Sequence, residues 1–387
     1  MRVRTGAERL LADPTLIPGR RWGLITNYTA VLPNLELSAT LLHQETGRVA
    51  AILGPEHGLR GTAQAGFAED GGVDPLTGLP VVDTYGKSGA ALDEEIAKLG
   101  LDVLVADIQD VGARFYTYAW TVVDCMRSAA RLGLPFYVLD RPNPLGGEVV
   151  DGPGLLPGFD SFIGRLNIPS RHGLTMGELA REAAAKDAAA GEAAVEPQVI
   201  RMEGWERTML WDETGLPWVF PSPNLPTPDT ALAYVGTCLF EGTNMSEGRG
   251  TTRPFELVGA PWLDEGFAAE LNALDLPGVR FRSSWFVPTF QKHEGVPVGG
   301  VQLHVSDRTS FNPILTGVSM LKVAQQIAPK SFEWRLPDWE EGASTRPFID
   351  LLWGSNSLRT GLASASGAAE VISEAPRAPE YLTEVLY

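Results

Sequence analysis

The stretch AILGPEHGLR, residues 51–60, decides the fold class of this sequence. An apolar run that gives way to Gly and Pro predicts a buried strand that leaves its sheet for a loop. Three other apolar runs also end in polar residues: WGLITN (22–27), LDVLVADIQD (101–110) and LPFYVLDRPN (134–143). Four strands that each deliver polar groups at their carboxyl ends are typical of an open parallel sheet with a binding crevice at that edge.

Helical patterns separate these strands. Apolar residues recur at helical spacing in three places: Leu35, Ala39 and Leu42; Leu92, Ile96 and Leu99; Val122, Met126 and Ala129. This alternation predicts a Rossmann-like α/β domain, in which helices cover both faces of a parallel sheet. Residues 79–85 are expected to add a short strand, with Ser88 as a helix cap. The segment 60–80 has no periodicity and predicts a long surface loop.

The length of 387 residues favours two domains. Gly and Pro interrupt every pattern between residues 146 and 158, so we place the boundary there. We expect residues 1–150 to form the Rossmann-like domain that carries the catalytic Glu. Residues 151–387 are expected to form a smaller α+β domain that completes a cleft, and they include an Ala- and Glu-rich helix at 176–194.

The composition excludes several classes of protein. A formal net charge of −17 argues against sequence-independent nucleic-acid binding and against docking to anionic membranes, both of which need clustered Lys and Arg. The two cysteines, Cys125 and Cys238, lie in apolar patterns and are expected to be buried, without a disulfide framework or a zinc cage. The first residues have no apolar core of the signal-peptide kind, which favours a cytoplasmic protein and leaves export open.

Familiar cofactor motifs do not occur in the sequence. No G-x-G-x-x-G opens the first helix, and no P-loop occurs, so a dinucleotide or a nucleoside triphosphate is not indicated. H-E-x-x-H, D-x-D-x-D-G and G-x-S-x-G are also missing, so neither a tight metal site nor a serine hydrolase is indicated. We therefore expect no cofactor.

The first candidate site follows the deciding stretch. Glu56 is our candidate catalytic carboxyl group, because a glutamate at a strand end in a partly closed crevice can serve as a general acid. His57 and Arg60 are candidate substrate contacts beside it. The alternative is an exposed loop glutamate, next to a histidine that bonds the backbone.

Further candidates lie in DIQDVGARFYTY, residues 107–118, and in DRPNP, residues 140–144. Asp107 is a candidate catalytic carboxylate, and the candidate substrate contacts are Asp110, Arg114, Tyr116, Asp140 and Asn143. Aromatic rings with carboxylates suit a sugar or another polyol. One alternative is an Asp107–Arg114 ion pair that only stabilises the turn. The other is that Asp140 and Asn143 build turns instead of contacting a ligand.

In the second half, polar residues concentrate in EGTNMSEGRGTTR, residues 241–253. Glu247 is a candidate catalytic residue there, and Glu241, Asn244 and Arg249 are candidate substrate contacts. Arg is the natural partner of a substrate carboxylate, although a solvated loop would explain any one of these residues. Two more candidate contacts lie outside this run: Asn224, in a Pro-rich run that could equally be a linker, and His293. Single histidines such as His293, His172 and His304 are more often structural.

Five segments, in this order, resemble the NamZ-type exo-β-N-acetylmuramidases, a family long catalogued only as a domain of unknown function: GPEHGLRG, DIQDVGARFYTY, LDRPNPLGG, PSPNLPT and EGTNMSEGRGTTRPFE. The resemblance extends from about residue 23 to residue 304. It implies a Rossmann-like domain joined to a smaller α+β domain, with the active site in the cleft between them. It also implies release of N-acetylmuramic acid from the non-reducing end of peptidoglycan fragments, without a cofactor and with Glu56 as the catalytic residue. A cytoplasmic member would act on imported fragments during recycling.

Glycoside hydrolysis needs two carboxyl groups, about 5–5.5 Å apart in retaining enzymes and about 6.5–9.5 Å apart in inverting ones. Asp107, Asp110 and Glu247 are the candidates for the second, unless the 2-acetamido group itself acts as the nucleophile. The lactyl carboxylate of N-acetylmuramic acid should meet an arginine, for which Arg249, Arg60 and Arg114 are candidates. Two rival interpretations are a glycosidase of other sugar specificity and a non-catalytic muropeptide-binding protein. The oligomeric state stays open.

Overall fold

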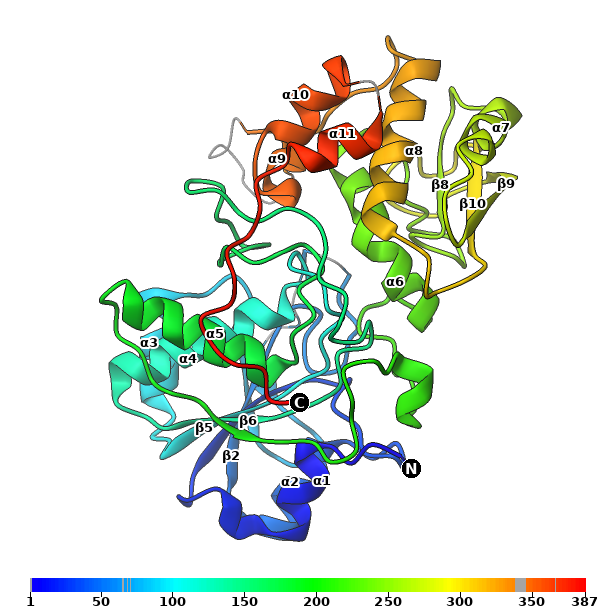
Figure 1. Cartoon of the computed structure of the whole chain (residues 1–387). Coiled ribbons are helices and arrows are strands. Elements are labelled where there is room, and N and C mark those ends of the chain that lie inside the picture. Colours follow the sequence, from blue (N-terminus) through cyan, green and yellow to red (C-terminus); the bar gives the residue numbers. More distant parts are fainter. Residues whose placement is uncertain (1, 65, 68, 70, 338–345, 366) are drawn as a thin grey trace. The chain divides into compact units, whose positions relative to one another are not determined.

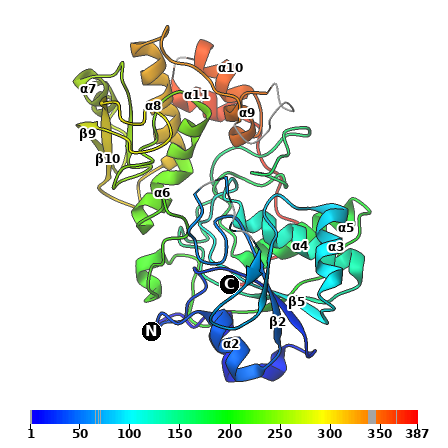
Figure 2. The same cartoon turned by 180° about the vertical axis from the view of Figure 1, so that it is seen from behind.

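The computed structural model describes residues 2–64, 66, 67, 69, 71–337, 346–365 and 367–387, and the chain divides into two compact units (Figures 1 and 2). The first unit, called the sheet unit below, comprises Met1–Val149, His172–Pro223 and Glu380–Tyr387. The second unit comprises Val150–Arg171 and Asn224–Pro379. Within the described residues, no helix is long and apolar enough to cross a bilayer.

The sheet unit contains a seven-stranded sheet in the order β3-β4-β2-β1-β5-β6-β7, in which only the edge strand β3 is antiparallel to its neighbour. Its strands are β1 Trp22–Thr26, β2 Val49–Gly54, β3 Gly72–Val73, β4 Pro80–Asp83, β5 Val103–Asp107, β6 Phe136–Leu139 and β7 Gln198–Ile200. The chain builds outward from β1 to one side and then, from β5, to the other. The β1/β5 pair is therefore the topological switch point, where ligands of such sheets bind.

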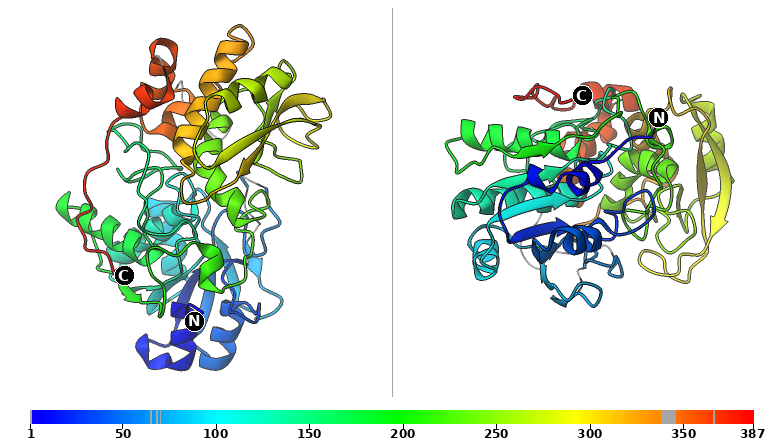
Figure 3. Two further views of the ribbon diagram at one scale, coloured as in Figure 1. Left: turned by 45° about the vertical axis from the view of Figure 1, so that its right-hand side comes forward. Right: turned by 90° about the horizontal axis from the view of Figure 1, so that it is seen from below.

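Helices cover both faces of this sheet, as predicted. Its helices are α1 Gly6–Ala12, α2 Ser38–Thr46, α3 Gly89–Lys98, α4 Tyr118–Leu132 and α5 Met176–Ala189, with 3₁₀ turns η1 Pro14–Leu16 and η2 Trp211–Thr214. α1 and α2 pack together on one face, and α3, α4 and α5 pack together on the other (Figures 1 and 3). The predicted fold class is confirmed.

Local signals mark where some of these helices begin and end. α4 is followed by Gly133, whose φ of 70° is the left-handed conformation that glycine adopts without strain. Ser88 is the residue before α3, but its side chain makes no capping hydrogen bond. α1 begins with a capping box between Thr5 and Glu8.

The sheet unit extends beyond the boundary that we expected at residue 150. β7 pairs with β6 in parallel, and α5 is the crossover that connects them. A parallel strand needs such a crossover to return to its sheet. The Ala-rich helix expected in the second domain therefore belongs to the sheet unit, and it ends at Ala189.

The last eight residues also belong to the sheet unit, where they pack along α5. Glu182 Oε2 accepts hydrogen bonds from the backbone N–H groups of Leu382 (2.8 Å) and Thr383 (3.0 Å). The hydroxyl of Tyr387 donates to Asp140 Oδ2 at 2.8 Å and accepts from the Met202 N–H at 2.9 Å. The C-terminal segment thereby closes over the end of β6.

The second unit is an α+β structure built on a three-stranded antiparallel sheet in the order β8-β10-β9 (Figure 1). Its strands are β8 Leu257–Ala260, β9 Val279–Phe286 and β10 Val298–Val305. Its helices are α6 Pro228–Thr237, α7 Glu265–Ala273, α8 Pro313–Ile327, α9 Phe348–Trp353, α10 Ser357–Ser364 and α11 Ala368–Ser373, with the 3₁₀ helix η3 Cys238–Gly242. α6 and α8 approach closely at Gly236, where a Cβ atom would lie only 1.8 Å from the Pro313 carbonyl oxygen.

Candidate active site

Glu56 lies at the carboxyl end of β2, and two loops hold its carboxylate. Its side chain is buried, and Oε1 accepts a hydrogen bond from the Gly66 N–H at 2.7 Å. Oε2 accepts from the hydroxyl of Thr117, the residue that precedes α4. Donors from the β2 loop and from the β5–α4 connection thus fix the orientation of this carboxylate.

His57 holds the loop that follows Glu56. Its Nδ1 donates to the Ala63 carbonyl at 2.9 Å, which places the proton on Nδ1 because a carbonyl can only accept. Its backbone N–H donates to the Phe67 carbonyl, and its ring meets the edge of Tyr118 with centroids 6.2 Å apart. The structure thus gives His57 the backbone-bonding role that we considered as its alternative.

Asp107 does not pair with Arg114, the partner that we considered from the sequence. Its carboxylate receives Arg141 Nε at 2.6 Å and Nη2 at 3.1 Å, and the Ser38 hydroxyl donates to Oδ2. Asp107 has no solvent-exposed surface, and Arg141 is also buried. Both oxygens of Asp107 are therefore engaged within the protein.

Asp110 lies after the same strand in a different setting. Its Oδ2 accepts from the Gly112 N–H at 2.7 Å and lies 3.3 Å from His172 Nε2. His172 Nδ1 accepts from the Leu174 N–H, so the proton of the imidazole lies on Nε2, facing Asp110. Within the described chain, Asp110 Oδ1 is buried and has no hydrogen-bond partner.

Two polar groups that the sequence did not select lie at the switch point between β1 and β5. Thr29 Oγ1 donates to Asn27 Oδ1 at 2.6 Å and accepts from the Gln109 N–H at 3.2 Å, so one threonine connects both residues. Asn27 Nδ2 and Gln109 Oε1 are buried and find no partner among the described residues. One donor and one acceptor at this switch point are therefore unsatisfied within the described chain.

The remaining candidates of the sheet unit are engaged within the fold. Asn143 uses both ends of its amide, with Nδ2 donating to the Leu174 carbonyl and Oδ1 accepting from the Leu145 N–H. Tyr116 donates its hydroxyl to the Pro221 carbonyl at 2.7 Å. Arg114 is buried, and this burial lowers its pKa to about 9.

Asp140 is a buried hub of the sheet unit. It accepts hydrogen bonds from the Thr175 hydroxyl, the Gly177 N–H and the Tyr387 hydroxyl, each at 2.8 Å. Burial raises the pKa of Asp140 to about 6, although these donors oppose the shift. Its position favours a structural role that joins α5, β6 and the C-terminal segment.

This raised pKa predicts a pH dependence of stability. The folded protein holds the Asp140 proton more tightly than the unfolded chain does. Its contribution to stability is therefore full below about pH 4 and is lost as the pH rises through about 6. Relative to the non-titrating variant Asp140→Asn, the wild-type free energy of unfolding should fall by about 2–3 kcal/mol between pH 4 and pH 7. Urea unfolding of both proteins at the two pH values measures this, and an equal difference at both values would contradict it.

The polar run of the second unit forms a buried ionic cluster. Arg249 lies 2.6 Å from Glu241 and 3.3 Å from Glu247, and Lys292 lies 2.6 Å from Glu247. Burial raises the pKa of Glu241, whereas Lys292 and Arg249 outweigh burial at Glu247 and lower its pKa. Arg249 Nη1 is buried without a hydrogen-bond partner among the described residues. Lys292, which the sequence did not single out, completes the cluster.

The other candidates of the second unit support its local structure. Asn244 donates to the Ser331 carbonyl and accepts from the Glu333 N–H. His293 Nε2 donates to the Asn244 carbonyl at 2.7 Å. Asn224 is buried.

Comparison with known proteins assigns the chain to a family. A family model described as "Exo-beta-N-acetylmuramidase NamZ, N-terminal" matches residues 22–229. The model of the C-terminal domain of the same family matches residues 232–379. The chain belongs to the NamZ family of exo-β-N-acetylmuramidases. The family resemblance noted in the sequence is thus confirmed, and this NamZ-family chain is a glycoside hydrolase.

Individual relatives of this NamZ-family chain extend over nearly its whole length. The peptidoglycan β-N-acetylmuramidase NamZ of Bacillus subtilis (strain 168) is 43% identical over 378 residues, which cover 96% of this chain and 87% of the relative. The crystal structure of a DUF1343 family protein from Bacteroides fragilis NCTC 9343 superposes with a TM-score of 0.82 at 34% identity, covering 94% of this chain and 92% of that one. A second DUF1343 family protein of that organism gives a TM-score of 0.73 at 28% identity, covering 96% and 94%.

The candidate residues of this NamZ-family chain fall into two groups, one in each unit. Glu56, Asn27, Gln109 and Asp110 lie at the carboxyl edge of the large sheet, whereas Glu241, Glu247 and Arg249 lie in the second unit. In the described part of the chain, no three His, Cys, Asp or Glu side chains gather as metal ligands would. Cys125 and Cys238 are free and buried, as predicted.

Proposed function

We propose that this chain is an exo-acting glycoside hydrolase that releases N-acetylmuramic acid from the non-reducing end of peptidoglycan fragments, with Glu56 as general acid/base. The role of Glu56 is supported by one observation. Hydrogen bonds from Gly66 and Thr117, one to each oxygen, orient its buried carboxylate at the edge where parallel sheets bind ligands. The substrate class is supported by the name of the Bacillus subtilis relative.

In this proposal, Glu56 gives its proton to the glycosidic oxygen as the bond to the anomeric carbon breaks. A fixed donor lowers the barrier because the leaving sugar departs as a neutral alcohol. The Thr117 hydroxyl and the Gly66 N–H then stabilise the carboxylate that remains. The same carboxylate can afterwards accept a proton from the water that completes hydrolysis.

Asp110 is the second carboxyl group that we favour. Asp107 forms a buried ion pair with Arg141 and has no solvent-exposed surface, and Glu247 is paired with Lys292 and Arg249. Asp110 keeps one oxygen without a protein partner in the described chain, while Gly112 and His172 hold the other side of its carboxylate. It could orient the acetamido group of the substrate or assist the attacking water.

Asn27 and Gln109 fit the same proposal. A secondary amide offers one acceptor and one donor, which matches the amide N–H of Asn27 and the amide oxygen of Gln109. An N-acetyl sugar carries such an amide beside its anomeric carbon. We propose that these two side chains form hydrogen bonds with that amide of the substrate.

A disaccharide assay tests the proposed function. We expect the wild-type protein to split N-acetylmuramyl-N-acetylglucosamine into its two sugars and to leave N-acetylglucosaminyl-N-acetylmuramic acid intact. Chromatography of the products distinguishes the two results. Binding of the first disaccharide without turnover would support the non-catalytic alternative, and cleavage of both disaccharides would contradict the proposed specificity.

A further inference from the structure

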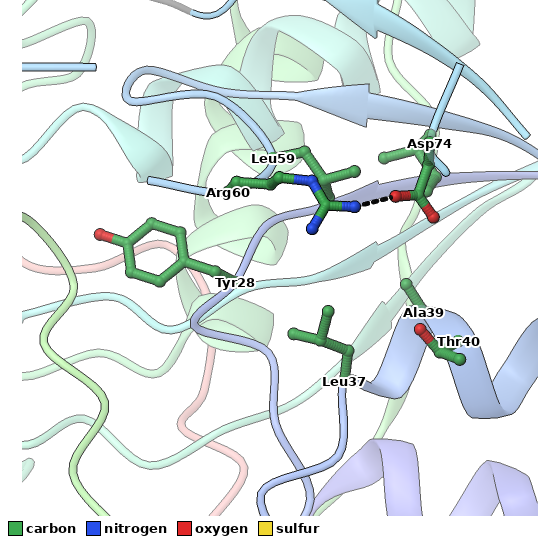
Figure 4. A pocket seen from close by; sticks show the side chains of 8 residues that line it. Tyr28, Leu37, Ala39, Thr40, Leu59, Arg60 and Asp74 are labelled. Atoms are coloured by element: carbon green, nitrogen blue, oxygen red, sulfur yellow. Dashed lines mark hydrogen bonds and ion pairs between the residues drawn. The ribbon is translucent and has the colours of Figure 1, made fainter. Parts of the chain in front are cut away.

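A small pocket of the sheet unit lies next to the loop that begins at Glu56 (Figure 4). Its volume is about 130 Å³. Four of its lining side chains, together called the apolar wall below, are apolar: Leu37, Ala39, Ile52 and Leu59. The other four are polar: Tyr28, Thr40, Arg60 and Asp74. The pocket therefore combines an apolar wall with one cation, Arg60, and the carboxylate that pairs with it, Asp74.

Asp74 fixes the guanidinium of Arg60 at this pocket. Arg60 Nη2 lies 2.6 Å from Asp74 Oδ1, and Figure 4 shows this contact above Leu37 and Ala39. Asp74 Oδ2 accepts from both the N–H and the hydroxyl of Thr77. Burial alone would raise the pKa of Asp74, but Thr77 and Arg60 outweigh it and lower that pKa, so Asp74 is charged at neutral pH.

Arg60 keeps donors free for a ligand. Its side chain is 44% exposed, and among the described residues only Asp74 receives a hydrogen bond from its guanidinium. The other two candidate arginines differ, since Arg114 is buried and Arg249 is paired with two glutamates. A planar guanidinium held on one edge can present its other edge to a carboxylate.

The size of the pocket limits what can bind. Pockets for whole small molecules span about 300–1,000 Å³, and a water molecule takes up about 30 Å³ of the liquid. A pocket of about 130 Å³ therefore suits one substituent of a sugar, not the ring. The lactyl ether of N-acetylmuramic acid is such a substituent, with a methyl group for the apolar wall and a carboxylate for the cation.

We propose that this pocket is the lactyl subsite, with Arg60 binding the carboxylate and Leu37, Ala39 and Ile52 contacting the methyl group. The inference rests on the proposed function and names the part of the substrate that sets its specificity. Leu59 and Arg60 belong to the loop that carries Glu56, so the proposed proton donor and the proposed subsite share one loop.

Tyr28 connects the pocket with Glu56. Its side chain lines the pocket, and burial together with the charges of Glu69 and Glu56 raises the pKa of its hydroxyl. Tyr28 is therefore within electrostatic reach of the proposed acid.

The charge of Arg60 can be tested with two chromogenic substrates, the N-acetyl-β-muraminide and the N-acetyl-β-glucosaminide that lacks the lactyl group. Arg60→Gln should lower the ratio of their kcat/KM values by about 10- to 100-fold, because a charge-assisted hydrogen bond to the carboxylate is lost. Arg131→Gln is the matched control, since Arg131 of α4 forms a partly exposed ion pair with Asp93 of α3 at 2.7 Å in the same unit. The control should keep the wild-type ratio.

The apolar wall can be tested with an analogue whose 3-O-carboxymethyl ether lacks the lactyl methyl group. Wild-type protein should prefer the lactyl ether by about tenfold, which is typical of one methyl group in an apolar pocket. Ala39→Val, which narrows the pocket, should remove this preference. The comparison of the two ethers with wild-type protein needs no variant, so it remains decisive even if Arg60→Gln fails to fold.

The outcomes separate this inference from the proposed function. If the wild type cleaves the muraminide but shows no preference for the methyl group, or if Arg60→Gln keeps the wild-type ratio, the pocket is not the lactyl subsite. If the wild type cleaves no glycoside, the proposed function fails. Calorimetry with free N-acetylmuramic acid and N-acetylglucosamine then still tests the pocket, and equal affinity for both sugars would overturn it.

Discussion

Replacing Glu56 with Gln is expected to lower kcat for the N-acetyl-β-muraminide by about 10²–10⁴-fold, the usual contribution of a general acid. The substitution keeps the size of the side chain and removes only its proton-donating acid. Gln can retain both contacts, because its oxygen accepts from the Gly66 N–H while its amide donates to the Thr117 hydroxyl oxygen. The fold should therefore survive, and steady-state kinetics measure the loss.

Two controls show whether a loss of kcat is specific to Glu56 and is a loss of chemistry. Glu45→Gln changes an exposed glutamate of α2 and should leave kcat unchanged. Calorimetry should show that Glu56→Gln still binds N-acetylmuramic acid, which separates lost chemistry from lost binding. A Glu56→Gln protein with kcat close to that of the wild type would remove Glu56 from its proposed role.

Replacing Asp107 with Asn should mainly destabilise the fold, by about 3–5 kcal/mol in the free energy of unfolding. The variant leaves the buried Arg141 guanidinium without its carboxylate, and an unpaired buried charge is costly. Urea unfolding followed by circular dichroism measures the loss. Asp107 was our sequence-based candidate for catalysis, so this experiment also tests whether its role is structural.

A double variant sharpens that test. Asp107→Leu combined with Arg141→Met removes both charges and should recover much of the stability, because apolar replacement of a whole buried pair is often neutral. If Asp107→Asn instead unfolds like the wild type and loses its activity, Asp107 is a catalytic residue and our structural assignment is wrong.

The sequence predicted the edge of the sheet but not which polar groups at that edge stay available. Asp107 and Asp110 follow the same strand, three residues apart, and look alike in the sequence. Their difference comes from Arg141 and His172, which lie 34 and 62 residues further along the chain than Asp107 and Asp110, respectively. Gln109 and Thr117 were missed because a neutral side chain in a polar stretch carries no local signal.

The sequence by itself determined the doubly wound sheet, the helices between its first strands and the loop position of Glu56. Those features depend on hydrophobic periodicity and on Gly and Pro breaks, which act over a few neighbouring residues. Only the tertiary structure decided that β7 and Glu380–Tyr387 belong to the sheet unit, that Arg141 neutralises Asp107, and that Arg60 lines a pocket. These depend on contacts between residues far apart in the chain, which short-range patterns do not encode.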